Sequence, residues 1–360
     1  MRRAPSLIVG GGPAGSAAAI ALARAGLGPE LIERTEAPHD VVCGGFLGWD
    51  ALAALRRLGL DPGALGARPI QHMRLVSARR TIEADLPRTA GGLSRRTLDE
   101  AMLNAASEAG ASLSRGRTVR AADLERRCVR LDDEGEVAGE ILILATGKHE
   151  LRGGARPVDI STRPLGLRTA LKPSPGLAKA LEGVIELHLY EGGYAGLLMQ
   201  EDGTANLCLS ASRARLKAAG GIEPLVEQLA AELPALGSRL DDGEVVGWSA
   251  VSGVPYGWRA SATVDGVYRV GDQAAVIASL AGDGIAIALE SGLAAARAIA
   301  AGTPARDFQR QWASRARRPI GLAEVLRRSA EHDRARAAMM GLLGWFPSLA
   351  PLAARLTRIG

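Results

Sequence analysis

Three glycines near the N-terminus, Gly10, Gly12 and Gly15, follow a short apolar run (7–9), precede an alanine-rich segment (13–25) and match the pattern G-x-G-x-x-G. The apolar run is typical of a buried parallel strand, and the alanine-rich segment is typical of a helix. In such a strand–turn–helix unit, Gly10 allows the tight turn, Gly12 lets a pyrophosphate approach the backbone, and Gly15 lets the helix pack closely on the strand. The start of the helix would supply amide donors for the phosphates.

A second apolar pair, Leu31 and Ile32, ends at Glu33, which lies 23 residues after Gly10. This is close to the spacing of about 20 residues expected for an acidic residue that binds ribose hydroxyls. A glycine-rich turn with only a packing role is the alternative. The order strand, glycine triplet, helix, strand and acid favours a dinucleotide site.

The composition excludes several classes of protein. The chain has 360 residues, 47% hydrophobic and 23% charged, with a net charge of +5 and only 3% aromatic residues. Its arginines form no basic stripe with interleaved rings, so we expect no nucleic-acid binding. The cysteines Cys43, Cys128 and Cys208 stand far apart and the histidines are isolated, which disfavours a disulfide framework and a metal site. The sequence predicts a cytoplasmic protein, with peripheral membrane contact left open.

A second glycine-bearing turn lies late in the chain. An apolar strand ends at Gly271-Asp272, and Gly282-x-Gly284 opens an alanine-rich helix over 284–301. The Asp272 carboxylate at the end of a strand suits a polyol hydroxyl, and the start of the helix favours negative charge, as on a reduced flavin ring. A simple strand–turn–helix with an N-capping aspartate is the alternative.

These patterns predict an α/β fold. We expect a discontinuous Rossmann-like dinucleotide-binding domain over 1–156 and 266–302. A substrate domain built on an antiparallel sheet would be inserted at 157–265, with residues 70–90 as candidates to join its sheet. A helical C-terminal region would follow at 303–360.

The two turns, together with Arg95-x-x-Leu98-Asp99 and Ala145-Thr146-Gly147, resemble the FAD-dependent oxidoreductases of the para-hydroxybenzoate hydroxylase type. Cys43-Gly44-Gly45 and Tyr194 are similar to segments of the geranylgeranyl reductase-like branch. The resemblance covers about residues 5 to 300, and it implies that the domain over 1–156 and 266–302 is an FAD-binding domain of the GR2 type.

This resemblance implies that the first turn holds the ADP half of FAD, that Gly271-Asp272 holds the ribitol, and that the later Gly-x-Gly helix faces the flavin ring. The cofactor-binding residues that the resemblance and the motifs indicate are Gly10, Gly12, Pro13, Ala14, Gly15, Glu33, Arg34, Cys43, Gly44, Gly45, Arg95, Val119, Ala145, Gly147, Gly271, Asp272, Gly282, Gly284 and Ile285. Cys43 and Tyr194 are the candidates for a catalytic role, and either one also fits as a buried packing residue.

The predicted activity is an FAD-dependent oxidoreduction of an apolar small molecule, such as a prenyl, polyketide or aromatic compound. Alkene reduction and hydroxylation with NAD(P)H as transient electron donor both remain open. No second G-x-G-x-x-G marks a separate NAD(P)H domain. A non-catalytic electron-transfer flavoprotein subunit at a membrane is the alternative from another class. A halogenase is a weaker one, because the sequence does not place the Lys148 side chain.

The segment 339–358 is apolar, carries Trp345 and Phe346, and is interrupted by Pro347 and Pro351. Apolar and aromatic residues followed by arginines suit an interfacial membrane anchor. The alternative is a pair of C-terminal helices that packs on the pocket or on a partner subunit. The sequence predicts no oligomeric state.

Overall fold

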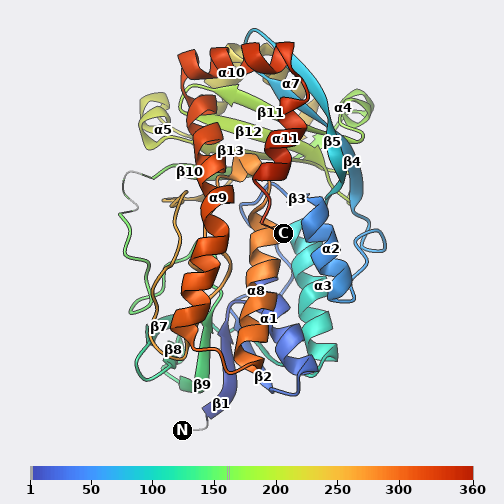
Figure 1. Cartoon of the computed structure of the whole chain (residues 1–360). Helices are drawn as coiled ribbons and strands as arrows, with labels where there is room; N and C mark the ends of the chain where they lie inside the picture. The colour runs from blue at the N-terminus through green and yellow to red at the C-terminus, as the bar shows by residue number, and fades with distance from the viewer. Residues whose placement is uncertain (1–2, 160, 162, 360) are drawn as a thin grey trace.

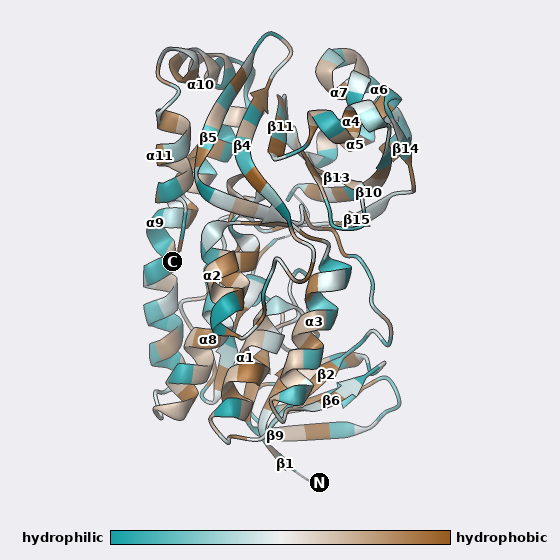
Figure 2. Cartoon of the chain, turned by 90° about the vertical axis from the view of Figure 1, so that its right-hand side faces the viewer, coloured by the Kyte–Doolittle hydropathy of each residue, from teal (hydrophilic) through white to brown (hydrophobic). Residues whose placement is uncertain are grey.

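The structure is a computed structural model, and it describes residues 3–159, 161 and 163–359. Two β-sheets organise the molecule, one in each half. The half that holds the N-terminus contains the first sheet with α1, α3 and α8, and the other half contains the second sheet (Figure 1). Figure 2, turned by 90°, shows the same division. The mixed α/β fold predicted from the sequence is confirmed.

The first sheet has the strand order β6-β2-β1-β9-β8-β7, and β16 pairs with β9. Its strands are β1 (Arg3–Val9), β2 (Pro29–Glu33), β6 (Ser112–Arg115), β7 (Val119–Asp123), β8 (Cys128–Leu131), β9 (Glu136–Leu144) and β16 (Val267–Arg269). In the parallel part, Ile8 pairs with Leu31 on one side and Ile143 on the other. All three side chains are buried, as expected for parallel strands covered on both faces.

Four helices belong to this half: α1 (Pro13–Arg24), α2 (Trp49–Arg57), α3 (Arg95–Glu108) and α8 (Gly284–Ala300). The helices α1 and α8 come from opposite ends of the chain and pack closely. A Cβ atom on Gly292 of α8 would lie only 2.3 Å from the Ala14 carbonyl oxygen of α1. This approach brings the early and the late glycine turn to the same place, as the sequence predicts.

The second sheet has the strand order β14-β10-β13-β12-β11-β4-β5-β3, and β15 pairs with β10. Its strands are β3 (Phe46–Leu47), β4 (Arg68–Val76), β5 (Thr81–Gly92), β10 (Leu165–Pro173), β11 (Val184–Tyr190), β12 (Gly193–Met199), β13 (Ala205–Ala211), β14 (Gly243–Val245) and β15 (Ser249–Val251). The pairing is antiparallel except between β11 and β4, which run parallel with Val184 opposite His72. The second sheet is therefore mixed, and its parallel strands β4 and β11 are not joined by a hairpin.

The two faces of the second sheet have different neighbours. One face packs on short helices, namely α4 (Pro175–Ala180), α5 (Arg213–Ala219), α6 (Ile222–Glu232) and α7 (Pro234–Asp241). The other face carries Ile185, Leu187 and Leu189 of β11 toward a cavity. Residues alternate between the faces of a strand, so Glu186 and His188 lie beneath the short helices.

Glu186 is the centre of a buried ionic cluster. Its side chain is 1% exposed and accepts hydrogen bonds from Arg74, from Arg239 (2.9 and 3.2 Å) and from His188 Nε2 (3.1 Å). Burial by itself raises the pKa of Glu186, but the hydrogen bonds from His188 and Arg239 outweigh it and hold the pKa at about 2. The cluster joins β4, β11 and α7 through one carboxylate.

The tail forms α9 (Ala305–Glu331), α10 (Asp333–Trp345) and α11 (Leu349–Leu356). The helix α9 runs along both halves of the molecule, and α10 and α11 fold back over the open face of the second sheet (Figure 1). After α11, Arg358 donates to Asp283 Oδ1 (2.9 Å) and to the Gly282 carbonyl (3.2 Å), and the Ile359 amide donates to Asp283 Oδ2 (3.1 Å). The end of the tail is thereby fixed to the loop that precedes α8.

Candidate functional site

The first glycine turn connects β1 to α1 beside the end of β9. Gly10 has a φ of +105°, and a Cβ atom at this position would lie 2.5 Å from the Ala145 carbonyl oxygen. A Cβ atom on Gly15 would lie 1.9 Å from the Gly10 carbonyl oxygen. Both positions therefore require glycine, and α1 begins immediately beyond the turn at Pro13. Its first amides face the space where the strands end.

Glu33 lies at the end of β2, next to this turn. Its Oε2 accepts a hydrogen bond from the Gly11 amide (2.7 Å), and its Oε1 accepts from the amide (2.9 Å) and hydroxyl (2.8 Å) of Thr35. A carboxylate has about four acceptor sites, so one remains for a ribose hydroxyl. Glu33 borders a cavity of about 530 Å³ that Arg34 and Val119 also line.

Arg95, the first residue of α3, lies across the turn from Glu33. Its Nε and Nη2 atoms both donate to Asp99, each at 2.7 Å. Burial by itself lowers the pKa of Arg95, but the Asp99 carboxylate outweighs it and raises the pKa above its ordinary value. Its Nη2 lies 3.2 Å from the position of a Cβ atom on Gly12. A fixed cation therefore stands where a pyrophosphate would approach the turn.

The second glycine turn follows β16. Gly271 has a φ of +59°, and its amide donates to Ser291 Oγ of α8 (2.7 Å). The carboxylate of Asp272 forms an ion pair with Lys148 at 3.1 Å. The Asp272 carboxylate raises the pKa of Lys148 and outweighs the opposite effect of burial. Lys148 is thus held as a cation beside the Ala145-Thr146-Gly147 turn.

The cavity bordered by Glu33 continues into a second cavity of about 440 Å³. The two share part of their walls, including Gly12, Arg95, Gly147, Lys148 and Asp272. Together they form one groove that runs from the ribose-binding acid to the second sheet. An elongated cofactor with a dinucleotide at one end and a ring system at the other fits this shape.

Three glycines leave room for a flat ring in the 440 Å³ cavity. Gly44, Gly147 and Gly284 all line it, and a Cβ atom on any of them would have no neighbour within 4 Å. Bare backbone from three separate segments therefore borders an open space, which side chains would otherwise fill. These residues fit an isoalloxazine ring, and the start of α8 at Gly284 would favour negative charge on it.

Beyond this space the cavity is walled by apolar side chains. They come from the second sheet and from α10 and α11, and include Met73, Leu75, Leu86, Ile185, Leu187, Leu189, Leu198, Met339, Leu343, Leu349 and Ala350. Neither histidine nor glutamate occurs among the described residues that line it. The substrate end of the groove is thus apolar and, in the described part of the chain, holds no acid–base pair of the common kind.

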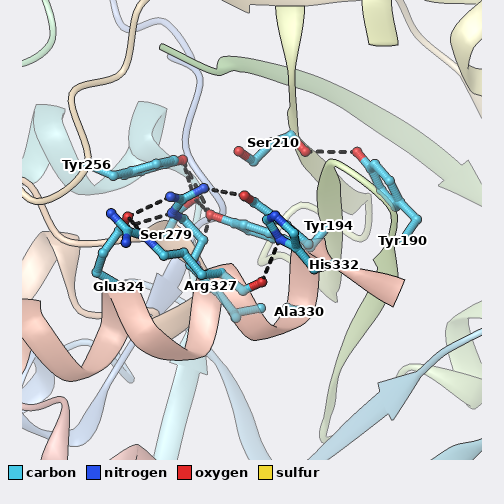
Figure 3. A network of polar contacts seen from close by, with 12 residues as sticks. Tyr190, Tyr194, Ser210, Tyr256, Ser279, Glu324, Arg327, Ala330 and His332 are labelled. Atoms are coloured by element: carbon cyan, nitrogen blue, oxygen red, sulfur yellow. Dashed lines mark hydrogen bonds and ion pairs between the residues drawn. The ribbon is translucent and has the colours of Figure 1, made fainter. Parts of the chain in front are cut away.

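Three hydroxyl groups meet at one side of this apolar cavity (Figure 3). Ser279 Oγ lies 2.5 Å from Tyr194 Oη and 2.7 Å from Tyr256 Oη, and the two phenol oxygens are 3.3 Å apart. The Leu280 amide donates to Tyr194 Oη (3.1 Å), and the Arg327 guanidinium of α9 lies 5.6 Å from the centre of the Tyr256 ring. Burial raises the pKa of Tyr194 well above its ordinary value. We call Tyr194, Tyr256 and Ser279 the hydroxyl cluster.

Cys43 and Cys208 line the same cavity, although they are 165 residues apart in the chain. Both are free thiols, and Asn206 Nδ2 donates to the Cys43 carbonyl at 3.0 Å. Burial, with a contribution from nearby Cys43, raises the pKa of the Cys208 thiol to about 12. A protonated thiol is a poor nucleophile, so Cys208 is unsuited to disulfide exchange with Cys43.

Every residue predicted to bind the cofactor lines one of the two cavities except Gly15, which is buried against the first turn. Tyr194 also lies in the cavity rather than only within the sheet. Sequence reasoning missed Tyr256, Ser279 and Arg358, which line the 440 Å³ cavity too. The only signal for Tyr256 is that tyrosine is rare in this chain, which has four. Among the described residues, no group of three or more His, Cys, Asp or Glu side chains could hold a metal ion.

The comparisons with known proteins agree with this geometry. Residues 3–151 match the model of a family described as FAD binding domain. A comparison with curated protein sequences gave no match. Many solved structures share the fold; the flavin-dependent brominase Bmp2 is 19% identical, with a TM-score of 0.80 over 99% of this chain and 93% of that one.

Two further solved structures share the fold. The myxobacterial chondrochloren halogenase CndH is 18% identical, with a TM-score of 0.77 over 96% of this chain and 90% of that one. A geranylgeranyl bacteriochlorophyll reductase-like protein from Thermoplasma acidophilum is 20% identical, with a TM-score of 0.68 over 86% of this chain and 82% of that one. At these identities the likeness concerns the fold. The family match identifies residues 3–151 as an FAD-binding domain, and the fold of the whole chain is the one that these solved structures share.

Proposed function

We propose that this protein reduces an apolar small molecule, such as a prenyl, polyketide or aromatic compound, that carries one hydrogen-bonding group. The observation that carries this proposal is the hydroxyl cluster, which brings three proton donors together in an otherwise apolar wall. A carbonyl or hydroxyl group of the substrate would bind there, and the rest of the molecule would lie against the aliphatic side chains.

Bound FAD would supply the hydride equivalent after its own reduction by NAD(P)H. The protein would hold the cofactor through the first turn, Glu33 and Arg95 at the dinucleotide end, and through Asp272 and Lys148 at the polyol. In the reduction of an alkene, the hydride would add to one carbon of the double bond and Tyr256 or Ser279 would donate a proton to the other, and the cluster would recover that proton from solvent. The raised pKa of Tyr194 keeps this hydroxyl neutral, so it orients the other two as a hydrogen-bond partner.

Hydroxylation is the second candidate, because a water-excluding cavity beside a flavin suits it as well. Hydroxylation of a phenol also needs a base that ionises the substrate. Among the described residues that line the cavity, the one carboxylate is that of Asp272, and it is paired with Lys148. The same ion pair disfavours a halogenase, because it keeps the Lys148 amine charged. An electron-transfer subunit would not need the apolar wall that extends this cavity beyond the flavin space.

The test is to supply the FAD-loaded protein with NADPH or NADH and a panel of prenyl, polyketide and aryl compounds, with and without oxygen. Reduction predicts a product two hydrogens heavier that forms without oxygen. A product heavier by one oxygen atom, formed only in air, would replace the proposal by hydroxylation. If neither NADPH nor NADH is oxidised with any of the compounds, the electron-transfer alternative is favoured.

Replacing Tyr256 with phenylalanine is expected to lower kcat by about 100-fold, because general acid catalysis contributes roughly 10²- to 10⁴-fold. FAD content should not change, since within the described part of the chain the phenol hydroxyl forms hydrogen bonds only with Tyr194 and Ser279. Tyr190→Phe is the matched control, because its hydroxyl donates to the Ser210 carbonyl on the other face of the sheet (Figure 3). Equal kcat values for the two variants would remove Tyr256 from the mechanism.

A further inference from the structure

Five of the eight large hydrophobic side chains that are exposed in the described part of the chain lie on one segment, 342–356. They are Leu342, Trp345, Phe346, Leu352 and Leu356. Trp345 is 82% exposed, although tryptophan is normally well covered in a folded protein. We call these five side chains the apolar patch.

The patch lies on α10 and α11, whose other side walls the substrate cavity. Met339, Leu343, Leu349 and Ala350 of these two helices line the cavity. Leu342 belongs to both sides, since it lines the cavity and is also 52% exposed. The cavity therefore approaches the surface at the patch, and only the thickness of one helix pair separates them.

Arginines lie beside α10 and on the two helices that carry the patch. Arg79 and Arg80 form the β4–β5 turn, which both views place beside α10 (Figure 1 and Figure 2). An Nη atom of Arg80 lies 3.4 Å from the position of a Cβ atom on Gly344. Arg334 and Arg355 are exposed on α10 and α11. None of the four forms an ion pair with a described carboxylate, although Arg355 borders a cavity that Asp50 and Glu290 also line.

Apolar and aromatic side chains on a surface with arginines beside them are typical of a segment that binds at a membrane interface. A second copy of the chain fits less well, because a two-fold contact through this patch would bring the same unpaired arginines face to face. No single helix in the described ranges is long and apolar enough to cross a bilayer, and α10 and α11 meet at 115°. Taken together, α10 and α11 have the length and composition of a span, but only as a pair that is bent at the break between them.

We infer that the apolar patch docks on an anionic phospholipid surface, with Trp345 and Phe346 inserted at the boundary between headgroups and acyl chains. Docking in this orientation places the cavity end of the helix pair against the lipid. An apolar substrate would then pass from the bilayer into the cavity beside Leu342 without crossing water. The passage of substrate rests on the proposed function, whereas docking itself does not.

The experiment measures binding of the full-length, FAD-loaded protein to vesicles of equal parts phosphatidylcholine and phosphatidylglycerol, and to vesicles of phosphatidylcholine alone, by sedimentation without substrate. We expect binding to the anionic vesicles that weakens with salt. The double variant Trp345→Ala/Phe346→Ala should bind them roughly 10- to 100-fold more weakly. Arg79→Glu/Arg80→Glu should reduce binding to the anionic vesicles only.

Val246→Ala is the matched control. Val246 is also exposed, but it follows β14, which is the edge strand opposite to the edge formed by β5 and β3. Equal binding of the double variant and the unchanged protein would overturn the inference, as would no binding of the unchanged protein. A dimer in lipid-free solution that the double variant abolishes would assign the patch to a second copy. Turnover of a detergent-dispersed substrate by the double variant tests the proposed function separately, because that measurement needs no membrane.

Discussion

Replacing Gly15 with alanine is expected to yield a protein that is purified without its yellow colour and binds added FAD at least 100-fold more weakly. The added methyl group would lie 1.9 Å from the Gly10 carbonyl oxygen, which is backbone and cannot rotate away. The first turn must then open, and the amides at the start of α1 leave the positions from which they would meet the phosphates. Flavin absorbance and a titration with FAD measure the effect.

Two matched glycine variants separate loss of the cofactor site from loss of the fold. Gly321→Ala lies in an exposed part of α9 with no neighbour within 4 Å, so it should keep full FAD binding and gain up to about 1 kcal/mol of stability. Gly284→Ala also meets no protein atom, yet its methyl group would project into the flavin space. If Gly284→Ala weakens FAD binding but leaves the melting temperature unchanged, the flavin ring lies against this turn. Unchanged FAD affinity in both Gly15→Ala and Gly284→Ala would contradict the site.

Replacing Glu186 with glutamine is expected to lower the free energy of unfolding by about 3 kcal/mol at neutral pH. The variant keeps the shape of the side chain but leaves Arg74 and Arg239 without their buried counter-charge, which is the costly way to break a buried ion pair. A pKa of about 2, against an ordinary value of 4.5, gives a similar magnitude by linkage. Denaturant unfolding at neutral pH measures it.

The same group predicts how stability changes with acid. Because the pKa of Glu186 is lowered on folding, its contribution is complete above pH 4.5 and is lost as the pH falls toward about 2. The variant Glu186→Gln should lose less stability than the unchanged protein over this range. Glu83→Gln is the control, since Glu83 also pairs with Arg74 but is 66% exposed, and it should cost less than about 1 kcal/mol. Parallel acid profiles for Glu186→Gln and the unchanged protein would contradict the assignment.

The FAD-binding half could be predicted from the sequence because local patterns specify it. The glycine triplet, the apolar runs at 7–9 and 31–32 and the later Gly271-Asp272 pair each fix a strand end or a helix start through backbone geometry. Because the backbone itself requires these residues, they can be recognised in the sequence without knowing which other residues they contact. The same reasoning explains why nearly all the predicted cofactor residues line one groove.

The substrate end could not be predicted in the same way. The pairing of β4 with β11 joins segments more than a hundred residues apart, and no local pattern encodes it. Tyr256 and Ser279 belong to loops whose positions depend on that pairing and on α9, so their contact with Tyr194 appears only in three dimensions. For Lys148, the residue type is visible in the sequence, but its ion pair with Asp272 is not.

The attachment of Arg358 and Ile359 to Asp283 has a thermodynamic consequence. The loop that receives the tail is the one that leads into Gly284 and the flavin space, so anything that orders this loop also favours the attached tail. Coupling of this kind is reciprocal. Saturation with FAD should slow digestion of the last helix by carboxypeptidase, and removal of that helix should weaken the binding of FAD.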